Sequence, residues 1–421
     1  AKSGRSLSRS DRNDLRAFCG GRLPWEKDEP KTEQSEQPRV DPHSLVNAMT
    51  IISSASDDGL PLWKTMRDQR QASKLFESKE WAMLTEIAKS CMMERPTVPV
   101  WQWACENVFL DEVATAEPGF YDITRTPWAR EWQELPLRPD CRVGAIKKPS
   151  RCGASEAALN IIRWMPKFWP GNAGMAYPDD KQARDVVDRR LLRSIRRICE
   201  SQRTGDKDDE GLSNINLLNM AIRAGGSASS RLFTEWWVRF WLLDEIEEHD
   251  TSDTTSTFKR ALSRQADVVD ALLFAVSKPK RTGGPIDDIF VQGSQKKYLV
   301  PCPRCERRLE FVRHQFRYDH ARRLDGTWDL EAVIAGTWYQ CQHCNGRIEE
   351  KEKRAMLQEG IWVPTPPEQR RHNAEGKYVP PTPGWESYQI SDYYALHHEV
   401  RWGKLMAQYL TAFEINPSIE D

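Results

Sequence analysis

Four of the ten cysteines form two Cys-x-x-Cys pairs, Cys302 with Cys305 and Cys341 with Cys344, and an apolar segment precedes each pair. Two intervening residues let both thiolates of a pair bind one ion, so the pairs supply a tetrahedral Cys₄ set. Four thiolates leave no position for water, and we therefore expect structural zinc (Zn²⁺) rather than catalytic zinc. The 35 residues between the pairs exceed the usual spacing of a zinc ribbon, which predicts an inserted hairpin. His343 is expected to be a spectator.

Residues 143–156, VGAIKKPSRCGASE, indicate a buried strand, a tight loop and the start of a helix. Such a loop directs backbone N–H groups and the positive end of a helix at one point, which is a geometry that binds phosphate. The common pattern GxxxxGK[ST] is only partly present: Gly153 and Ser155 match its end, but Ala154 occupies the lysine position and Lys148 the first glycine position. The loop is therefore either a broken phosphate site or one whose lysine has moved.

Two further apolar segments end in polar residues. Residues 236–243 lead into Asp244 and Glu245, and residues 271–276 lead into Ser277. A buried strand that delivers carboxylates at its carboxyl end is how α/β folds place Mg²⁺-linked groups beside a ligand. We expect Asp244 to hold Mg²⁺ through water and Glu245 to orient or deprotonate an attacking water. Ser277 would lie beside these acids and sense a terminal phosphate, or be a simple turn residue.

Two aromatic residues precede the loop, in a segment punctuated by Pro and Gly. Tyr121 and Trp128 could stack on a purine base, and packing in the core is the alternative for both. Five arginines surround the cysteine pairs and would face either DNA or solvent: Arg304, Arg307, Arg308, Arg313 and Arg317.

The elements that must position these residues alternate between strand and helix. A helix from about 154 to 164, ending near Pro166, is followed by a strand at 174–178. Asp179 then caps a long helix that runs to about 203, and residues 216–223 form a further strand candidate. This alternation predicts an α/β fold with a parallel sheet and helices on both faces.

The 421 residues divide into five predicted parts. These are a mobile basic and polar arm (1–40), a helical leader (41–115), a phosphate-binding core (116–297), a Cys₄ module resembling a zinc ribbon (298–350), and a C-terminal return segment (351–421) that ends in a helix from about 400 to 414. A net charge of −1 with 29% charged residues fits a globular protein. No apolar run of about 18 residues is present, so we expect no membrane partner and a cytoplasmic setting.

In this order, the lysine-first loop, the Asp-Glu strand, the Ser277-Lys-Pro279 turn and the paired cysteines resemble the large terminase subunit of tailed bacteriophages, specifically the lambda-like branch. The resemblance covers roughly residues 98–415. It implies a P-loop NTPase fold of the ASCE type, with ATP and Mg²⁺ as cofactors. It also implies a motor that hydrolyses ATP to drive double-stranded DNA into a procapsid in the bacterial host cytoplasm.

The resemblance assigns roles residue by residue. Lys148 matches the loop lysine, Arg151 a cis-acting arginine finger, Ser155 and Asp244 the Mg²⁺ ligands, and Glu245 the catalytic acid. The residues expected to contact the nucleotide are Lys148, Ser150, Arg151, Gly153, Ala154, Ser155, Asp244, Tyr121, Trp128 and Ser277. The implied partners are DNA, a small terminase subunit, the portal of the procapsid, and further copies of the chain in a homo-oligomeric ring.

Three departures accompany the resemblance. Ala129 replaces a glutamine that often contacts adenine, and Lys278 replaces a small hydroxyl residue in the coupling turn. The family also continues into an RNase-H-like nuclease domain, whereas this sequence stops at Asp421, so we expect a truncated or incomplete chain. The departures leave an alternative from another class: a non-catalytic zinc-ribbon scaffold or DNA-binding protein with a decayed nucleotide site. A helicase-type ATPase would need a second core domain, for which residues 350–421 are too short.

Overall fold

The computed structural model describes residues 97–204, 206–250 and 255–415. The expected arm at 1–40 lies outside these residues, and so does most of the expected leader at 41–115. The described end of the leader contains the helix α6 (Val100–Asn107) and a two-stranded sheet. Its strands are β1 (Phe109–Leu110) and β2 (Gly119–Phe120).

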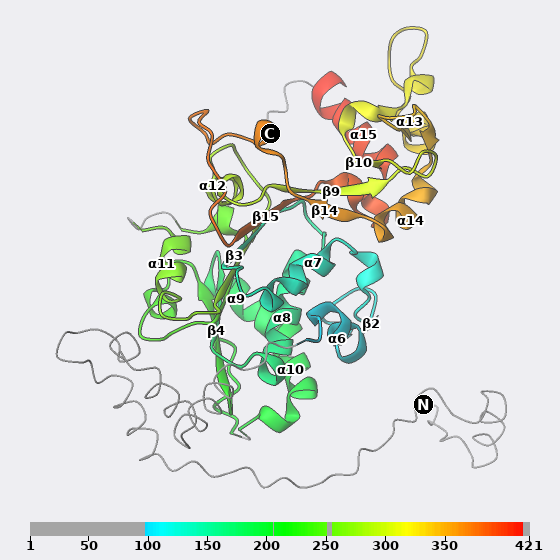
Figure 1. Cartoon of the computed structure of the whole chain (residues 1–421). Coiled ribbons are helices and arrows are strands. Elements are labelled where there is room, and N and C mark those ends of the chain that lie inside the picture. The colour runs from blue at the N-terminus through cyan, green and yellow to red at the C-terminus, as the bar shows by residue number, and fades with distance from the viewer. Residues whose placement is uncertain (1–96, 205, 251–254, 416–421) are drawn as a thin grey trace, which may run out of the picture. The chain divides into compact units, whose positions relative to one another are not determined.

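A ten-stranded sheet organises the described residues (Figure 1). Every neighbouring pair from β9 to β6 is parallel, whereas β10, β14 and β5 pair antiparallel. The strands in spatial order are β10 (Arg308–Leu309), β9 (Lys296–Pro301), β15 (Trp385–Gln389), β3 (Val143–Lys147), β8 (Leu272–Ser277), β7 (Phe240–Asp244), β4 (Ala173–Tyr177), β6 (Met220–Gly226) and β5 (Asn214–Leu217), with β14 (Ile361–Val363) also paired to β9. The parallel sheet expected from the sequence is confirmed.

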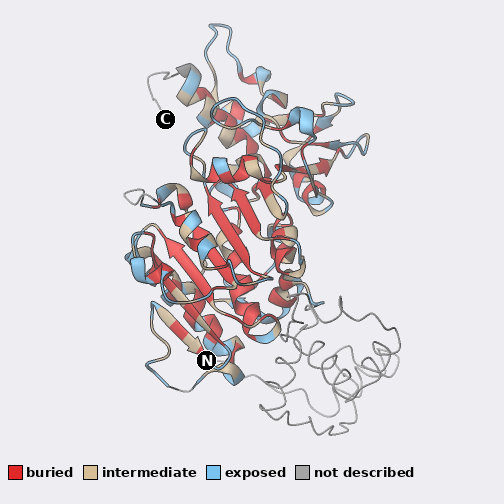
Figure 2. Ribbon diagram, turned by 60° about the vertical axis from the view of Figure 1, so that its left-hand side comes forward, coloured by how far each residue is buried: buried red, intermediate tan, exposed pale blue. Residues whose placement is uncertain are grey.

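Helices cover both faces of this sheet, which is why its central strands are buried throughout (Figure 2). One side carries α6, α7 (Ala129–Glu134), α8 (Ala154–Phe168) and α10 (Arg193–Ile198), and the other carries α11 (Thr257–Ser263) and α12 (Pro285–Gln292), as Figure 1 shows. Along β3, Ile146 joins one apolar cluster, whereas Val143 and Ala145 join the other. Burial on both faces explains why these strands are apolar runs without alternation.

The carboxyl ends of the central strands meet at one edge of the sheet. Lys147 pairs with Ser277 across β3 and β8, and Asp244 pairs with Val276 across β7 and β8. One strand, β8, therefore separates the strand that leads into the loop from the strand that carries the acids. Parallel topology alone brings these three segments together.

Several predicted elements differ in their bounds. The strand expected at 216–223 is a hairpin, β5 and β6, because the chain reverses at Leu218, which is 69% exposed. The helix α8 continues through Pro166 to Phe168, since a proline in the last turn removes only one hydrogen bond. The long helix after Asp179 is divided into α9 (Asp180–Val186), a π-helical turn η3 (Val187–Leu192) and α10.

The cysteine pairs lie in the C-terminal part of the described chain. The predicted boundary at 298 falls within β9, a strand of the main sheet. The segment between the pairs is more than the expected hairpin, because it contains both a strand and a helix. This part comprises β11 (Phe316–Arg317), β12 (Trp338–Gln340), β13 (Arg347–Ile348), α13 (Leu330–Gly336), α14 (Lys353–Gln358) and α15 (Trp402–Leu410), with a π-helical turn (Thr411–Ile415) after α15.

Candidate functional site

The loop between β3 and α8 has the backbone of a tight turn. Arg151 and Gly153 both take left-handed conformations, with φ of 60° and 80°. A Cβ atom on Gly153 would lie 2.9 Å from Cγ2 of Thr126, so both conformation and space call for glycine at this position. The helix α8 begins directly after Gly153 and presents its positive end to the loop. Ser150 and Arg151 are exposed.

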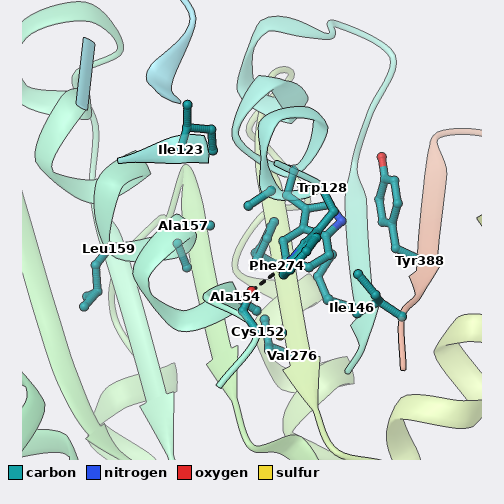
Figure 3. Packing of buried hydrophobic residues seen from close by; sticks show 14 of the residues in the cluster. Ile123, Trp128, Ile146, Cys152, Ala154, Ala157, Leu159, Phe274, Val276 and Tyr388 are labelled. Atoms are coloured by element: carbon teal, nitrogen blue, oxygen red, sulfur yellow. Dashed lines mark hydrogen bonds between the residues drawn. The ribbon is translucent and has the colours of Figure 1, made fainter. Parts of the chain in front are cut away.

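Trp128 supports this loop from the core. Its indole Nε1 donates a hydrogen bond to the carbonyl of Cys152 at 2.9 Å (Figure 3). Trp128 is 1% exposed and Tyr121 is 7% exposed, and the Tyr121 hydroxyl accepts a hydrogen bond from Gln133. The structure thus agrees with the core-packing alternative for both rings. A base could stack on either ring only if that ring left the core.

Lys148 contacts the second acid of the Asp-Glu pair. Its Nζ atom lies 2.7 Å from Oε1 of Glu245, although the two residues are 97 positions apart. Burial disfavours the charge on Lys148, but the hydrogen bond and charge of Glu245 and the charge of Asp244 outweigh it and raise the pKa of Lys148. The backbone of Glu245 is left-handed, with φ of 54°. The moved lysine of the loop is therefore a buried cation in contact with the expected catalytic carboxylate.

Asp244 and Ser155 meet beside this ion pair. Asp244 is 5% exposed; burial raises the pKa of its carboxyl group, against a hydrogen bond from Ser155 and the charge of Lys148. A carboxylate and a hydroxyl are oxygen ligands of the kind that Mg²⁺ prefers. These two residues, expected from the sequence to share an ion, lie close enough to hold one together.

Ser277 joins the end of β8 to both acids and to the loop. Its hydroxyl donates to Oε2 of Glu245 at 3.3 Å and accepts from the backbone N–H of Glu247 at 3.2 Å. The Ser277 carbonyl accepts from the backbone N–H of Lys148 at 3.0 Å. Ser277 is fully buried, while the neighbouring Lys278 is exposed. A serine next to the catalytic acid fits the predicted sensing position.

Two buried ion-pair clusters near the loop were not identified from the sequence. Glu156, in the first turn of α8, pairs with Arg163 at 2.5 Å and also with Arg190. Burial raises the pKa of Glu156, but the two arginines outweigh it and bring it to about 2. The only sequence signal was an acid and a base seven residues apart, which places both on one face of a helix.

The second cluster involves the other lysine of the Lys-Lys pair. Lys147 contacts Asp287 at 2.5 Å, and Asp287 also binds Arg371. Adjacent residues at the end of a strand point in opposite directions, so the two lysines reach different partners. Lys147 is therefore part of the core on the α12 side, and Lys148 belongs to the site.

The four sulfur atoms of the cysteine pairs lie within 4.8 Å of one another. The Sγ atoms of Cys302 and Cys344 are 3.9 Å apart, as are those of Cys305 and Cys341. Zn–S bonds of about 2.3 Å give tetrahedral edges of about 3.8 Å, so these thiols fit a zinc ion. The His343 imidazole contacts the carbonyl of Arg308 at 2.8 Å and lies outside the sulfur cluster, as expected.

The arginines around the sulfur cluster all contact groups within the chain. Arg304 forms an ion pair with Glu352, and Arg313 lies over the ring of Tyr409. The partners of the other three are carbonyl oxygens or the amide of Gln340: Arg307, Arg308 and Arg317. These contacts give each arginine a role without DNA.

Comparisons with known proteins point to one family. A family model described as "Phage terminase large subunit gpA, ATPase domain" matches residues 115–362. No match was found among curated protein sequences.

Among solved structures, the chain is similar to the large terminase ATPase domain of Thermus phage P74-26, with 15% identity, 36% of this chain and 65% of that chain covered, and a TM-score of 0.30. It is also similar to the large terminase of bacteriophage HK97, with 12% identity, coverage of 46% and 40%, and a TM-score of 0.36. For the large terminase of a thermophilic bacteriophage, identity is 17%, coverage 37% and 38%, and the TM-score 0.25. The chain thus spans less than two thirds of each of these relatives.

Proposed function

Because the chain belongs to the family of phage terminase large subunits that the gpA ATPase-domain model describes, we propose that it is the ATP-hydrolysing part of a motor that moves double-stranded DNA into a procapsid. The contact between Lys148 and Glu245, beside Ser155 and Asp244, carries this proposal. It supplies, around one loop, a cation for phosphate, a carboxylate for water and two oxygen ligands for Mg²⁺.

The ion pair suggests how nucleotide binding prepares the site for hydrolysis. Glu245 and the phosphate oxygens compete for the same ammonium group of Lys148. When phosphate takes Lys148, Glu245 is released to accept a proton from an attacking water. The Ser277 hydroxyl, which contacts Glu245 now, keeps that carboxylate next to β8. Mg²⁺, held by Ser155 and Asp244, would neutralise charge on the phosphates.

Arg151 is proposed to stabilise charge that develops on the phosphates. It lies exposed in the loop, in a left-handed conformation, and can therefore turn toward a bound nucleotide without leaving the core. Ser150, Gly153 and Ala154 would contribute backbone N–H groups to the same phosphates.

We also propose that the four thiols bind one structural zinc ion. The ion would join the turn between β9 and β10 to the turn between β12 and β13, two segments that are distant in sequence. Its role would be to hold this part of the fold together, because four thiolates leave no open position for chemistry.

The remaining partners are proposed from family membership alone. They are the small terminase subunit, the portal of the procapsid, and other copies of the chain in a ring, all in the host cytoplasm. Among the described residues, no helix is long and apolar enough to cross a membrane.

Titration of the purified chain with ATP and Mg²⁺ tests the proposal. We expect saturable binding that Lys148→Ala weakens strongly and that the exposed-lysine control Lys351→Ala leaves unchanged. A folded chain that binds no ATP would contradict the motor and favour the decayed-site alternative.

A further inference from the structure

The order of strands limits where the base of a bound nucleotide can lie. The acids follow β7, which is two strands from β3 on one side, and β15 pairs with β3 on the other side. The terminal phosphate must approach Glu245, so the rest of the nucleotide extends over the loop and away from β7. The rings first expected to hold the base, Tyr121 and Trp128, are sealed in the core and offer no open face.

A cavity of about 300 Å³ opens on the β15 side of the loop. It lies at the carboxyl ends of β15, β3 and β8, where ligands of open α/β sheets bind. Its walls include Lys148, Pro149, Ile390, Ser391, Met406 and Tyr409. The volume is at the lower end of the range for small-molecule sites, which suits part of a nucleotide rather than a large ligand.

The chemistry of the walls suits a flat heteroaromatic ring. Ile390, Met406 and Tyr409 supply apolar surface, and the first two are buried. The Ser391 hydroxyl is shielded from solvent and has no hydrogen-bond partner among the described residues. A buried hydroxyl without a partner is costly, and a ligand that donates or accepts a hydrogen bond there would remove that cost.

A carboxyl group lies next to this hydroxyl in the chain. Burial raises the pKa of Asp392, and the charge of Lys278 opposes that shift. Both residues line the cavity. An exocyclic amino group would find an acceptor in either Asp392 or Ser391, whereas the phosphates lie at the loop end of the cavity, next to Lys148.

We infer that this cavity binds the purine base of the nucleotide, with Ser391 and Asp392 as its polar contacts and Met406 and Tyr409 as its apolar wall. The inference rests on the proposed ATPase function and adds the element that recognises the base. It links the nucleotide to α15, whose first residue, Trp402, packs against Tyr339 of the cysteine-bearing part. The replacement at Ala129 then has no cost for base recognition, because the base lies elsewhere.

Binding of ATP should be compared with binding of inorganic tripolyphosphate, which has the phosphates but no base. We expect Ser391→Trp, which fills the cavity, to weaken ATP binding at least about tenfold, equivalent to about 1.4 kcal/mol, and to leave tripolyphosphate binding unchanged. Gln408→Trp, an exposed position on the same helix, is the matched control and should change neither. Equal ATP affinity in Ser391→Trp and the parent chain would overturn the inference.

Lys148→Ala separates this inference from the proposed function, since it should weaken both ligands. If the parent chain binds neither ligand, the ATPase proposal itself fails. Photolabelling of the unmodified chain with 8-azido-ATP avoids any folding defect in a variant. Label in the peptides that carry residues 389–409 is the expected result, and label confined to residues 121–128 would contradict it.

Discussion

The phosphate loop and the sulfur cluster are both assembled from distant segments, yet they are held in opposite ways. The four thiols already lie at the spacing of a tetrahedral zinc site, with no competing partner of opposite charge among the described residues. The loop lysine is instead paired with the acid that would later act on water. A metal would complete the first site as it stands, whereas a nucleotide must exchange partners in the second.

This difference separates a site that stabilises the fold from a site that works in a cycle. A structural ion gains most when its ligands are fixed, because binding then contributes folding free energy directly. A catalytic acid must be held back until substrate is present, and the Lys148–Glu245 pair provides such a hold. Four changes test this contrast.

The largest effect is expected at the sulfur cluster. Cys341→Ser should reduce zinc from about one ion per chain to none, since structural zinc in small domains contributes about 10–16 kcal/mol of apparent binding free energy. Hydrogen exchange over β12 and β13 should lose its protection. Cys105→Ser, which lies outside the cluster, is the control and should keep its zinc. Full protection in a metal-free parent chain would contradict the structural role.

Glu245→Gln should separate binding from chemistry. Loss of a positioned base lowers hydrolysis by about 10²–10⁴-fold. The variant also frees Lys148 from its ion pair, so affinity for ATP should rise rather than fall. Parallel measurements of the hydrolysis rate and of ATP affinity check both points, and weaker ATP binding in the variant would argue against competition for Lys148.

The Glu156 cluster should respond to pH as a structural group. Its pKa falls from 4.5 in the unfolded chain to about 2 in the fold, so its stabilisation is fully present above about pH 4.5 and is lost as pH falls toward 2. Glu156→Gln leaves Arg163 buried without its charge partner and should cost about 3–5 kcal/mol at pH 7. Denaturant unfolding at pH 7 and pH 3 should show a smaller difference between parent and variant at the lower pH. A constant difference would rule out this titration.

The smallest effect is expected at Gly153. Gly153→Ala places a Cβ 2.9 Å from Thr126 in a left-handed conformation, which should cost about 1–3 kcal/mol and disturb the loop. Gly376→Ala is the matched control, because Gly376 has φ of 73° and open space around it. Thermal unfolding of both variants separates backbone strain from the steric clash. Equal losses would mean that Thr126 does not restrict the loop.

The sequence was most informative where chemistry depends on short spacing. Two Cys-x-x-Cys pairs predicted a cluster whose sulfur atoms do lie together, and the apolar runs before Asp244 and Ser277 predicted the strands that meet at one edge. The roles of Lys148, Arg151 and Glu245 in catalysis stay predictions. The lambda-like assignment was finer than the family match, which establishes phage terminase large subunits.

Partners that depend on tertiary packing were not visible in the sequence. Nothing local distinguishes Lys147 from Lys148, and their different contacts follow from the direction of the side chains at the end of β3. The burial of Trp128 likewise depends on Tyr298, 170 positions later, which packs edge-on against its ring. Buried ion pairs such as Glu156 with Arg190 join separate elements, so no periodic pattern announces them.

The central claim is that the working lysine of this loop is Lys148 at its start, with Ala154 at the usual lysine position. The most direct test is the steady-state rate of Mg²⁺-dependent ATP hydrolysis by Lys148→Ala, measured beside Lys351→Ala with DNA present. The account predicts a loss of about 10²–10³-fold for Lys148→Ala alone, at unchanged thermal stability. Hydrolysis by Lys148→Ala at the parent rate would contradict it.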